Sequence, residues 1–293
     1  SGDGGYGSGD GGYGSGDGGY SSGDGGYGSG DGGYNSGDGG YNSGDGGYGS
    51  GDDDHNASAH YLTKVTAPDG ASEDQFGRPV SQSGDILAVG AKYSDPGGVA
   101  DAGAAYLYKV EQNGTATYLT KVTAPDGAQA DQFGYSVSQS GDFLAVGAYG
   151  SDPGGVYNAG AAYLYKLEQN GTATFLTKVT APDGAASDSF GYSVSQSGDV
   201  LAVGAYQSDP GGVSNAGAAY LYKLEQNGTA TYLTKVTAPD GAASDYFGYS
   251  VSQSGDVLAV GAYYSDPGGV SGAGAAYLYK LEQNGTATYL TKV

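Results

Sequence analysis

The chain has 293 residues, of which 60 are glycine, and it contains no cysteine, methionine or tryptophan. Glycine makes up only roughly 7% of an average protein, so this composition differs from that of an ordinary globular domain. The net charge of −21 at pH 7 argues against binding nucleic acid or an anionic bilayer through general electrostatics, and no apolar run is long enough for direct membrane insertion.

Residues 1–49 are a tract of seven heptads, SGDGGYG, in which only the last position varies. Tyrosine is the only large side chain and glycine loses the most backbone entropy on ordering, so the tract cannot build a core of its own. Because seven is odd, successive tyrosines in an extended strand would point to opposite faces, and polyproline II would also scatter them. A disordered linker is one interpretation, and a series of docking units ordered by contacts outside the tract is the other.

The heptad is also similar to the repeat of calcium-binding β-rolls, GGxGxDxUx. It differs from that repeat in its period, in the position of its aspartate and in having no apolar position. Residues 50–60 form an acidic connector. It contains residues of the types that bind metals, but no fixed scaffold positions them, so we expect a solvated segment. These residues are Asp52, Asp53, Asp54, His55 and His60.

The remaining domain, 61–293, contains four 57-residue units without insertions, at 66–122, 123–179, 180–236 and 237–293. In the third unit, residues 190–196 alternate and predict a first strand, and the apolar run 200–206 predicts a buried second strand. Residues 218–226 and 229–236 flank Asn227-Gly228, which is a strong signal for a hairpin with a type I′ turn. The prediction is an all-β fold of four tandem four-stranded antiparallel blades, either a β-propeller or a propeller-like array.

The third unit contains Phe190-Gly191 followed by Val203-Gly204-Ala205, a combination that resembles the FG-GAP repeat of integrin α chains and of many extracellular repeat proteins. The other units carry the same pair of half-motifs: Phe76-Gly77 with Val89-Gly90-Ala91, Phe133-Gly134 with Val146-Gly147-Ala148, and Phe247-Gly248 with Val260-Gly261-Ala262. The resemblance implies a β-propeller on the cell surface or outside the cell. We expect the four phenylalanines to be buried beside the second strands.

Two features depart from that family. Tyrosine or lysine stands where the family has its final proline, and SQSGD replaces the family's calcium loop. One aspartate in a tight turn cannot supply the five or more oxygens that Ca²⁺ prefers. We therefore expect no calcium at the turn aspartates, which are Asp85, Asp142, Asp199 and Asp256.

Carboxylates do cluster in the loop before each first strand. The pairs are Asp126 and Asp131, Asp183 and Asp188, and Asp240 and Asp245, and unit 1 has Asp69, Glu73 and Asp74. Aspartate in such loops ordinarily accepts hydrogen bonds from backbone N–H groups, which is the expectation here. A low-affinity cation site is the alternative, and no cofactor is expected.

Five N-x-[ST] sequons are present, at Asn56, Asn113, Asn170, Asn227 and Asn284. The last four lie at the predicted hairpin tips, where asparagine also serves the turn. If a eukaryotic cell secretes the protein, we expect N-linked glycans at these positions.

An enzyme is not expected, because both histidines lie in the connector and the four units are near copies of one another. The favoured hypothesis is an extracellular structural or adhesive protein that self-associates into a filament or surface sheath, through the tract and open strand edges. The alternative is an integrin-like propeller that binds a matrix or surface ligand. The fourth-strand sequence occurs five times, from Tyr61–Val65 to Tyr289–Val293. One copy is therefore surplus: it is available for pairing with another chain, or the sequence is a section of a longer array.

Overall fold

The computed structural model describes residues 61–293 apart from Gln226 and Gln283, together with the backbone of seven short strands in the first 50 residues. The chain divides into two parts, 1–61 and 62–293. The acidic connector, with His55, Asn56 and His60, lies outside the described residues.

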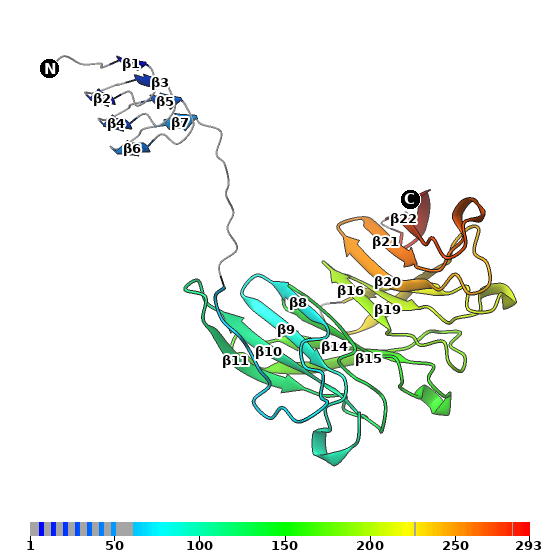
Figure 1. The fold of residues 1–293 in the computed structure, drawn as a ribbon. Coiled ribbons are helices and arrows are strands. Elements are labelled where there is room, and N and C mark those ends of the chain that lie inside the picture. Colours follow the sequence, from blue (N-terminus) through cyan, green and yellow to red (C-terminus); the bar gives the residue numbers. More distant parts are fainter. Residues whose placement is uncertain are drawn as a thin grey trace. The chain divides into compact units, whose positions relative to one another are not determined.

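The tract contains three-residue strands, each made of a tyrosine, the variable residue and a serine. They are β1 (Tyr6–Ser8), β2 (Tyr13–Ser15), β3 (Tyr20–Ser22), β4 (Tyr27–Ser29), β5 (Tyr34–Ser36), β6 (Tyr41–Ser43) and β7 (Tyr48–Ser50). Each strand pairs in parallel with the strand two heptads away, which gives the sheets β1-β3-β5-β7 and β2-β4-β6 (Figure 1). Tyr6, Tyr20, Tyr34 and Tyr48 are successive Cα partners.

This pairing differs from the scattered tyrosines expected of a single extended strand. The scattered arrangement would hold only for one uninterrupted conformation over the whole tract. In the structure the pairing spacing is 14 residues, which is twice the heptad, so the odd period of the heptad no longer separates the tyrosines. Alternation between two parallel sheets is the arrangement of parallel β-helices, the class to which the β-roll alternative belongs.

Residues 62–293 form four antiparallel sheets, one from each unit, which confirms the predicted all-β fold. Unit 1 contains β8 (Val80–Ser83), β9 (Ile86–Ala91), β10 (Ala104–Val110) and β11 (Ala116–Val122). Unit 2 contains β12 (Ser136–Ser140), β13 (Phe143–Ala148), β14 (Ala161–Leu167) and β15 (Ala173–Val179). Unit 3 contains β16 (Ser193–Ser197), β17 (Val200–Ala205), β18 (Ala218–Leu224) and β19 (Ala230–Val236). Unit 4 contains β20 (Phe247–Ser254), β21 (Val257–Ala262), β22 (Ala275–Leu281) and β23 (Ala287–Lys292).

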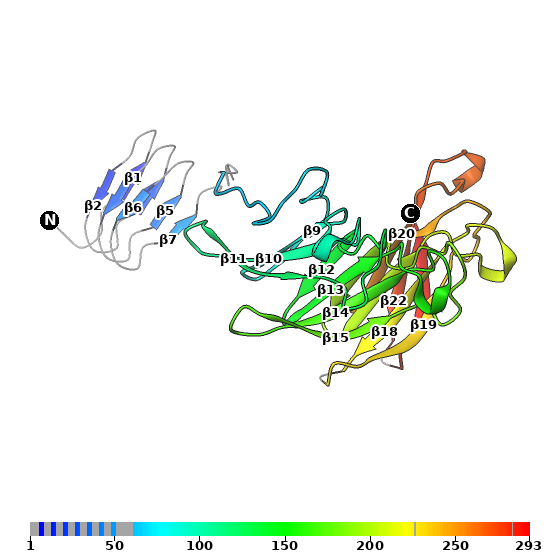
Figure 2. The same cartoon turned by 90° about the horizontal axis from the view of Figure 1, so that it is seen from below.

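Neighbouring strands in each of these four sheets are consecutive in sequence, and the sheets of units 1, 2 and 3 each pack against the sheet of the next unit (Figure 2). The loop after each second strand contains a short 3₁₀ turn, at η1 (Pro96–Gly98), η2 (Pro153–Gly155), η3 (Pro210–Gly212) and η4 (Pro267–Gly269). These turns are the only helical elements in the described residues. No helix there is long and apolar enough to cross a membrane.

The contacts between consecutive sheets repeat the same residue set. In the second of these interfaces, Ala145, Ala162 and Leu164 of unit 2 pack with Phe190, Val194 and Leu201 of unit 3. Ala88, Ala105 and Leu107 contact unit 2 in the same way, and Ala202, Ala219 and Leu221 contact unit 4. The hydrophobic core of the domain therefore lies mainly at three interfaces between units: units 2 and 3 each contribute to two of them, and units 1 and 4 to one each.

The predicted burial of the phenylalanines is confirmed for Phe133, Phe190 and Phe247, which have no exposed surface. Phe76 of unit 1 is only partly buried. It packs edge-on against Tyr106 at a centroid distance of 5.5 Å, beside Val65 and Ala67. Among the described residues, no alanine–alanine–leucine set from a preceding unit covers it.

The first strand begins later than predicted in units 2 and 3. Phe190 instead forms an isolated parallel bridge with Gly160 of the preceding unit, and β16 starts at Ser193. Gly160 has φ 85°, and a Cβ atom built on it would lie 2.0 Å from the Phe190 carbonyl oxygen. A glycine is therefore required on one side of this bridge, so that the backbones of two units can approach each other.

The type I′ turn predicted at the Asn-Gly pairs is wrong. In unit 1, Gly114 has φ 83° but Asn113 does not have a positive φ. The Gly114 amide donates to Glu111 O (2.8 Å), and the Glu111 amide donates to Thr115 O (2.8 Å). The hairpin is thus a longer loop that ends in a left-handed glycine, and Asn113 Oδ1 accepts hydrogen bonds from the backbone amide and the hydroxyl of Thr115.

A bulge in the fourth strand of units 1, 2 and 3 directs a leucine toward the next unit. Tyr108 pairs with Tyr118 and Leu107 with Thr120, which leaves Leu119 as the extra residue. A Cβ atom built on Gly171, at the hairpin tip of unit 2, would lie 3.0 Å from Leu119. Leu62 takes the same position over Gly114 of unit 1. The surplus copy of the fourth strand thus covers unit 1, although residues 61–65 are not a strand.

Candidate functional site: repeated polar networks and a row of tyrosines

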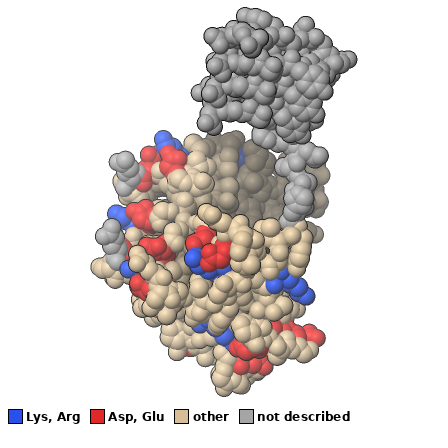
Figure 3. Space-filling view, turned by 90° about the vertical axis from the view of Figure 1, so that its left-hand side faces the viewer, with Lys and Arg blue, Asp and Glu red and all other residues tan. Residues whose placement is uncertain are grey.

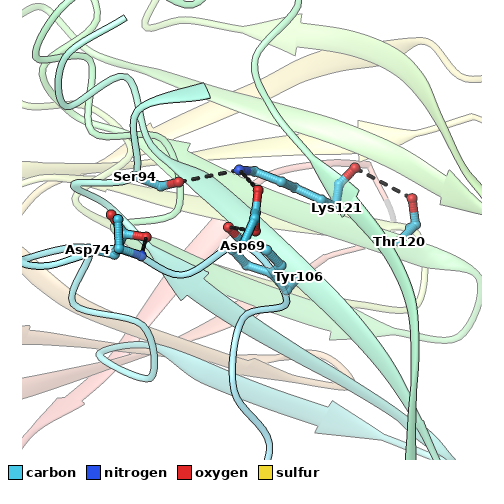
Figure 4. A network of polar contacts seen from close by, with 7 residues as sticks. Asp69, Asp74, Ser94, Tyr106, Thr120 and Lys121 are labelled. Carbon is cyan, nitrogen blue, oxygen red and sulfur yellow. Dashed lines mark hydrogen bonds and ion pairs between the residues drawn. The ribbon is translucent and has the colours of Figure 1, made fainter. Parts of the chain in front are cut away.

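The first aspartate of each loop pair belongs to a polar network that recurs in every unit. In unit 1, Asp69 Oδ1 accepts a hydrogen bond from Tyr106 Oη (2.8 Å) and Asp69 Oδ2 accepts one from Lys121 Nζ (2.8 Å) (Figure 4). Lys121 also donates to Ser94 Oγ (3.3 Å). The same Asp–Tyr and Asp–Lys bonds join Asp126 with Tyr163 and Lys178, Asp183 with Tyr220 and Lys235, and Asp240 with Tyr277 and Lys292.

These contacts determine how the first aspartate ionises. The hydrogen bond from Lys121 holds the pKa of Asp69 below its ordinary value, against the opposing effect of burial. At Asp126, burial raises the pKa, and the bonds from Lys178 and Tyr163 more than offset it, so the pKa is again low. In both loops the lysine ammonium group is the cation that balances the carboxylate.

The second aspartate of each pair has a different environment. Asp131 is buried, and its Oδ2 accepts a hydrogen bond from the backbone amide of Ala128 (2.9 Å). Asp188 makes the equivalent bond to Ala185 and Asp245 to Ala242. Burial raises the pKa of Asp131 and of Asp188.

The cation-site candidates Asp126, Asp131, Asp183, Asp188, Asp240 and Asp245 are thus each engaged by protein hydrogen bonds. Among the described residues, no group of three or more histidine, cysteine, aspartate or glutamate side chains is placed to hold a metal ion. In the turn between the first and second strands of unit 1, Gly84 has φ 59°, and Asp85 is its only carboxylate.

A row of tyrosines that the sequence analysis did not identify runs across units 2 to 4. We call Tyr135, Tyr149, Tyr192, Tyr206, Tyr249 and Tyr263 the aromatic row. The ring centroids of Tyr135 and Tyr192 lie 4.6 Å apart, and those of Tyr192 and Tyr249 lie 4.9 Å apart. Burial raises the pKa of Tyr206 to about 12. The signal in the sequence was the recurrence of two tyrosines every 57 residues, at positions assigned only to strands.

Cations replace both tyrosines of the row in unit 1. The Arg78 guanidinium lies 4.2 Å from the ring centroid of Tyr135, and Arg78 Nη2 donates to Tyr135 Oη (2.9 Å). Lys92 Nζ lies 4.0 Å from the centroid of Tyr93 and 5.3 Å from that of Tyr135. The row therefore ends in a cation–π contact on the side of unit 1 and in the exposed rings of Tyr249 and Tyr263 on the side of unit 4.

The sequon asparagines of the hairpins are exposed at Asn113, Asn170, Asn227 and Asn284. The hydrogen bonds of their side chains to the following threonine use Oδ1. The surface shown in Figure 3 carries acidic and basic side chains next to one another, in agreement with ion pairs such as Lys178–Asp126.

A cleft of about 1110 Å³ separates the hairpin ends of units 1 and 2. Its lining includes Asp85, Asp142 and Glu168, and also Lys109 and Lys166. It combines carboxylates and ammonium groups and could accommodate a polar ligand or a peptide segment.

Comparison with solved structures gives matches of low identity. A crystal structure of a protein from Lactobacillus plantarum is 19% identical with a TM-score of 0.49, and the match covers 74% of this chain and 55% of that one. Sqt1 of Saccharomyces cerevisiae is 11% identical with a TM-score of 0.44, over 76% of this chain and 49% of that one. The computationally designed Ika4 protein is 12% identical with a TM-score of 0.44, over 77% of this chain and 100% of that one. The chain thus spans about half the length of the first two proteins.

A search of curated proteins finds no match. The family model for the FG-GAP repeat matches four times, at residues 60–108, 117–165, 174–222 and 231–279. Each match begins at a fourth-strand sequence and ends in the third strand of the following unit, so Tyr61–Val65 belongs to the first match. These matches cover more than half of the chain, which is a member of the FG-GAP repeat family.

Proposed function

We propose that this protein is a non-enzymatic extracellular structural or adhesive protein, a self-associating subunit of a filament or surface sheath. The observation that carries the proposal is the uniformity of the units. The Asp–Tyr–Lys network recurs in all four with Asp–Lys distances of 2.8 to 2.9 Å. A catalytic site needs one distinct set of groups, whereas a structural lattice needs the same surface many times.

The strand pairing of the tract supports a role in assembly. The sheets β1-β3-β5-β7 and β2-β4-β6 are parallel and in register. Within the described strands, β1 and β7 each pair on one side only, and an unpaired strand edge can pair with the same edge of another chain. In contrast, the outer strands of the domain carry bulges, which disfavour pairing between edges.

The free-energy cost of ordering the tract also favours contacts between chains. Residues 1–49 contain 25 glycines, and ordering each backbone residue costs about 1–2 kcal/mol. Seven tyrosines contribute roughly 1.5–3 kcal/mol each when buried, which offsets only part of that cost. Pairing with neighbouring molecules would add backbone hydrogen bonds and more buried surface.

The test is deletion of residues 1–49 from the secreted chain, followed by sedimentation and electron microscopy. The domain should fold without the tract, because its four apolar clusters contain only residues from Val65 onward. We expect folded domains that no longer polymerise. A second variant replaces the seven tract tyrosines by serine. It keeps the length and charge of the chain, and we expect it to abolish polymers as the deletion does. Normal polymers from the deleted chain would refute the proposal.

The cleft between units 1 and 2 favours the alternative function, an integrin-like propeller that binds a matrix or surface ligand. The charged side chains that line the cleft could form ion pairs and hydrogen bonds with such a ligand. Lys109→Glu together with Lys166→Glu would reverse part of that lining. If the variant lost adhesion to cells or matrix while its polymers were normal, the ligand-binding function would be favoured over the structural one.

A further inference from the structure

Among the described residues, nothing covers the face of unit 4 that corresponds to the covered faces of units 1 to 3. Ala202, Ala219 and Leu221 of unit 3 are buried against unit 4, but the equivalent Ala259, Ala276 and Leu278 are only partly buried. Val293 is 74% exposed, whereas its counterpart Val236 is 6% exposed. We define the tail face as Ser250, Ser252, Ala259, Ala276, Leu278 and Leu290.

Unit 1 shows the complementary difference. Val80 is 63% exposed, whereas its counterpart Val137 is 9% exposed because it packs on Ala88, Ala105 and Leu107. Gln82 is exposed, although Gln139 is buried. We define the head face as Phe76, Gly77, Val80, Gln82 and Leu87. It contains the residue types that pack against an alanine–alanine–leucine set at each interface within the chain.

The polar groups of the two faces are complementary as well. Within the chain, Ser138 Oγ accepts a hydrogen bond from the Gln196 amide of the next unit (2.9 Å), and Ser193 Oγ donates to Gly248 O (2.9 Å). The counterparts on the tail face are Ser252 and Ser250, both exposed. The counterparts on the head face are Gln82 and Gly77.

We propose that the tail face of one copy docks on the head face of a second copy, and that two copies joined at both junctions form a closed pair of eight units. A second copy fits these faces because the chain itself already contains this interface three times. An interface between two different faces gives a closed ring when the rotation from one copy to the next returns to the first copy. Eight units are within the usual range of blade numbers in propellers. The proposal deepens the self-association proposed above but rests on residues of the domain, not of the tract.

The aromatic row would continue through such a junction. Tyr192 contacts both Tyr135 and Tyr249, so a residue inside the row has an aromatic neighbour on each side. Arg78 has such a neighbour, Tyr135, on one side. In the pair, the exposed Tyr249 of the second copy supplies the other, and the guanidinium lies between two rings.

One element is present twice at the junction. Leu62–Val65 and Leu290–Val293 have the same sequence, LTKV, and only one of them can cover the hairpin tip at Gly114. Leu62 occupies that place in the single chain, so it competes with Leu290 of the docking copy. Weakening the Leu62 contact should therefore strengthen the pair.

The experiment measures molar mass by light scattering over a wide range of concentrations, using the chain without residues 1–49. We expect a monomer–dimer equilibrium. Ser252→Arg places a bulky charge in the junction and should raise the dimer dissociation constant roughly tenfold or more. Thr288→Arg is the matched control, because its counterparts Thr117, Thr174 and Thr231 are exposed even where a unit follows. Leu62→Ser should lower the dissociation constant.

A monomer at every concentration would overturn the proposal, as would assemblies that grow beyond the dimer. An unchanged dissociation constant in Ser252→Arg would also overturn it. Growth into filaments without the tract would contradict the proposed function as well. A folded monomer without the tract would contradict only the closed pair.

Discussion

Two aspartates five residues apart in the same loop have pKa values that their neighbours shift in opposite directions. Asp126 lies beside the Lys178 ammonium group, while Asp131 is buried and is held by a backbone amide. A lowered pKa stabilises the folded state above the ordinary pKa, and this contribution is lost as the pH falls through the folded value. The raised pKa of Asp131 acts in the opposite direction: its contribution is complete below the ordinary pKa and is lost as the pH rises through the folded value.

Replacing the lysine separates these two effects. In Lys178→Met, the pKa of Asp126 should rise, because burial then acts without its main opposing contact. The pKa of Asp131 should remain above that of an ordinary aspartate, since burial dominates it. Carboxyl ¹³C chemical shifts measured against pH follow both groups. Lys166→Met, in β14, is the control and should leave Asp126 unchanged; an equal rise in both variants would contradict this account.

The buried phenylalanines are the residues whose loss should cost most. Phe190 is fully buried between units 2 and 3, so Phe190→Ala should lower the free energy of unfolding by about 3–5 kcal/mol. Phe175, on the outer strand β15, is 40% exposed, and Phe175→Ala is expected to cost less than half as much. Urea unfolding of the two variants provides the comparison. Similar costs would show that the interface between units is not the main core.

At the scale of elements, each hairpin shows why a turn residue and a modification signal coincide. Asn227 Oδ1 accepts hydrogen bonds from the amide and the hydroxyl of Thr229, and Gly228 has φ 87°. The same three residues therefore form the loop and complete the sequon. Turn formation alone would explain why these residues recur, so the fraction of sequons that carry a glycan has to be measured.

We expect N-linked glycans at the four hairpin tips when the chain is secreted from eukaryotic cells. The sites are Asn113, Asn170, Asn227 and Asn284, all exposed. Intact mass before and after enzymatic deglycosylation measures their occupancy. Asn170→Asp keeps the Oδ1 acceptor and removes only the attachment nitrogen, so it should lose one glycan and leave the hairpin folded. An unchanged mass in the parent protein would leave only the role in the turn.

At the scale of the whole molecule, the period of the sequence accounts for most of the fold. The absence of insertions predicted four units, and the Phe-Gly positions predicted the buried phenylalanines, of which Phe133, Phe190 and Phe247 are confirmed. That these side chains lie between consecutive units was not predicted, because the repeat does not say which units pack together. The hairpin type was mispredicted because the Asn-Gly signal is local, whereas the loop also depends on Glu111 and Thr115. The Asp–Tyr–Lys network was missed because Asp69 and Lys121 are 52 residues apart and meet only through the antiparallel strands.

The repeat also predicts a gradient of local stability along the domain. Strands β18 and β22 have the same sequence, AAYLYKL, so their intrinsic amide exchange rates match. Leu221 in β18 is 1% exposed, whereas Leu278 in β22 is only partly buried, since no described residues cover it as unit 4 covers Leu221. In an array each unit is stabilised by its neighbours, and a difference of about 1 kcal/mol in the free energy of local opening changes the amide exchange rate roughly fivefold.

In Ser252→Arg, amide exchange measured by NMR should therefore be faster in β22 than in β18. In the parent domain, the rate in β22 should fall as concentration rises and a second copy covers the strand; equal rates in Ser252→Arg would contradict stabilisation by neighbouring units.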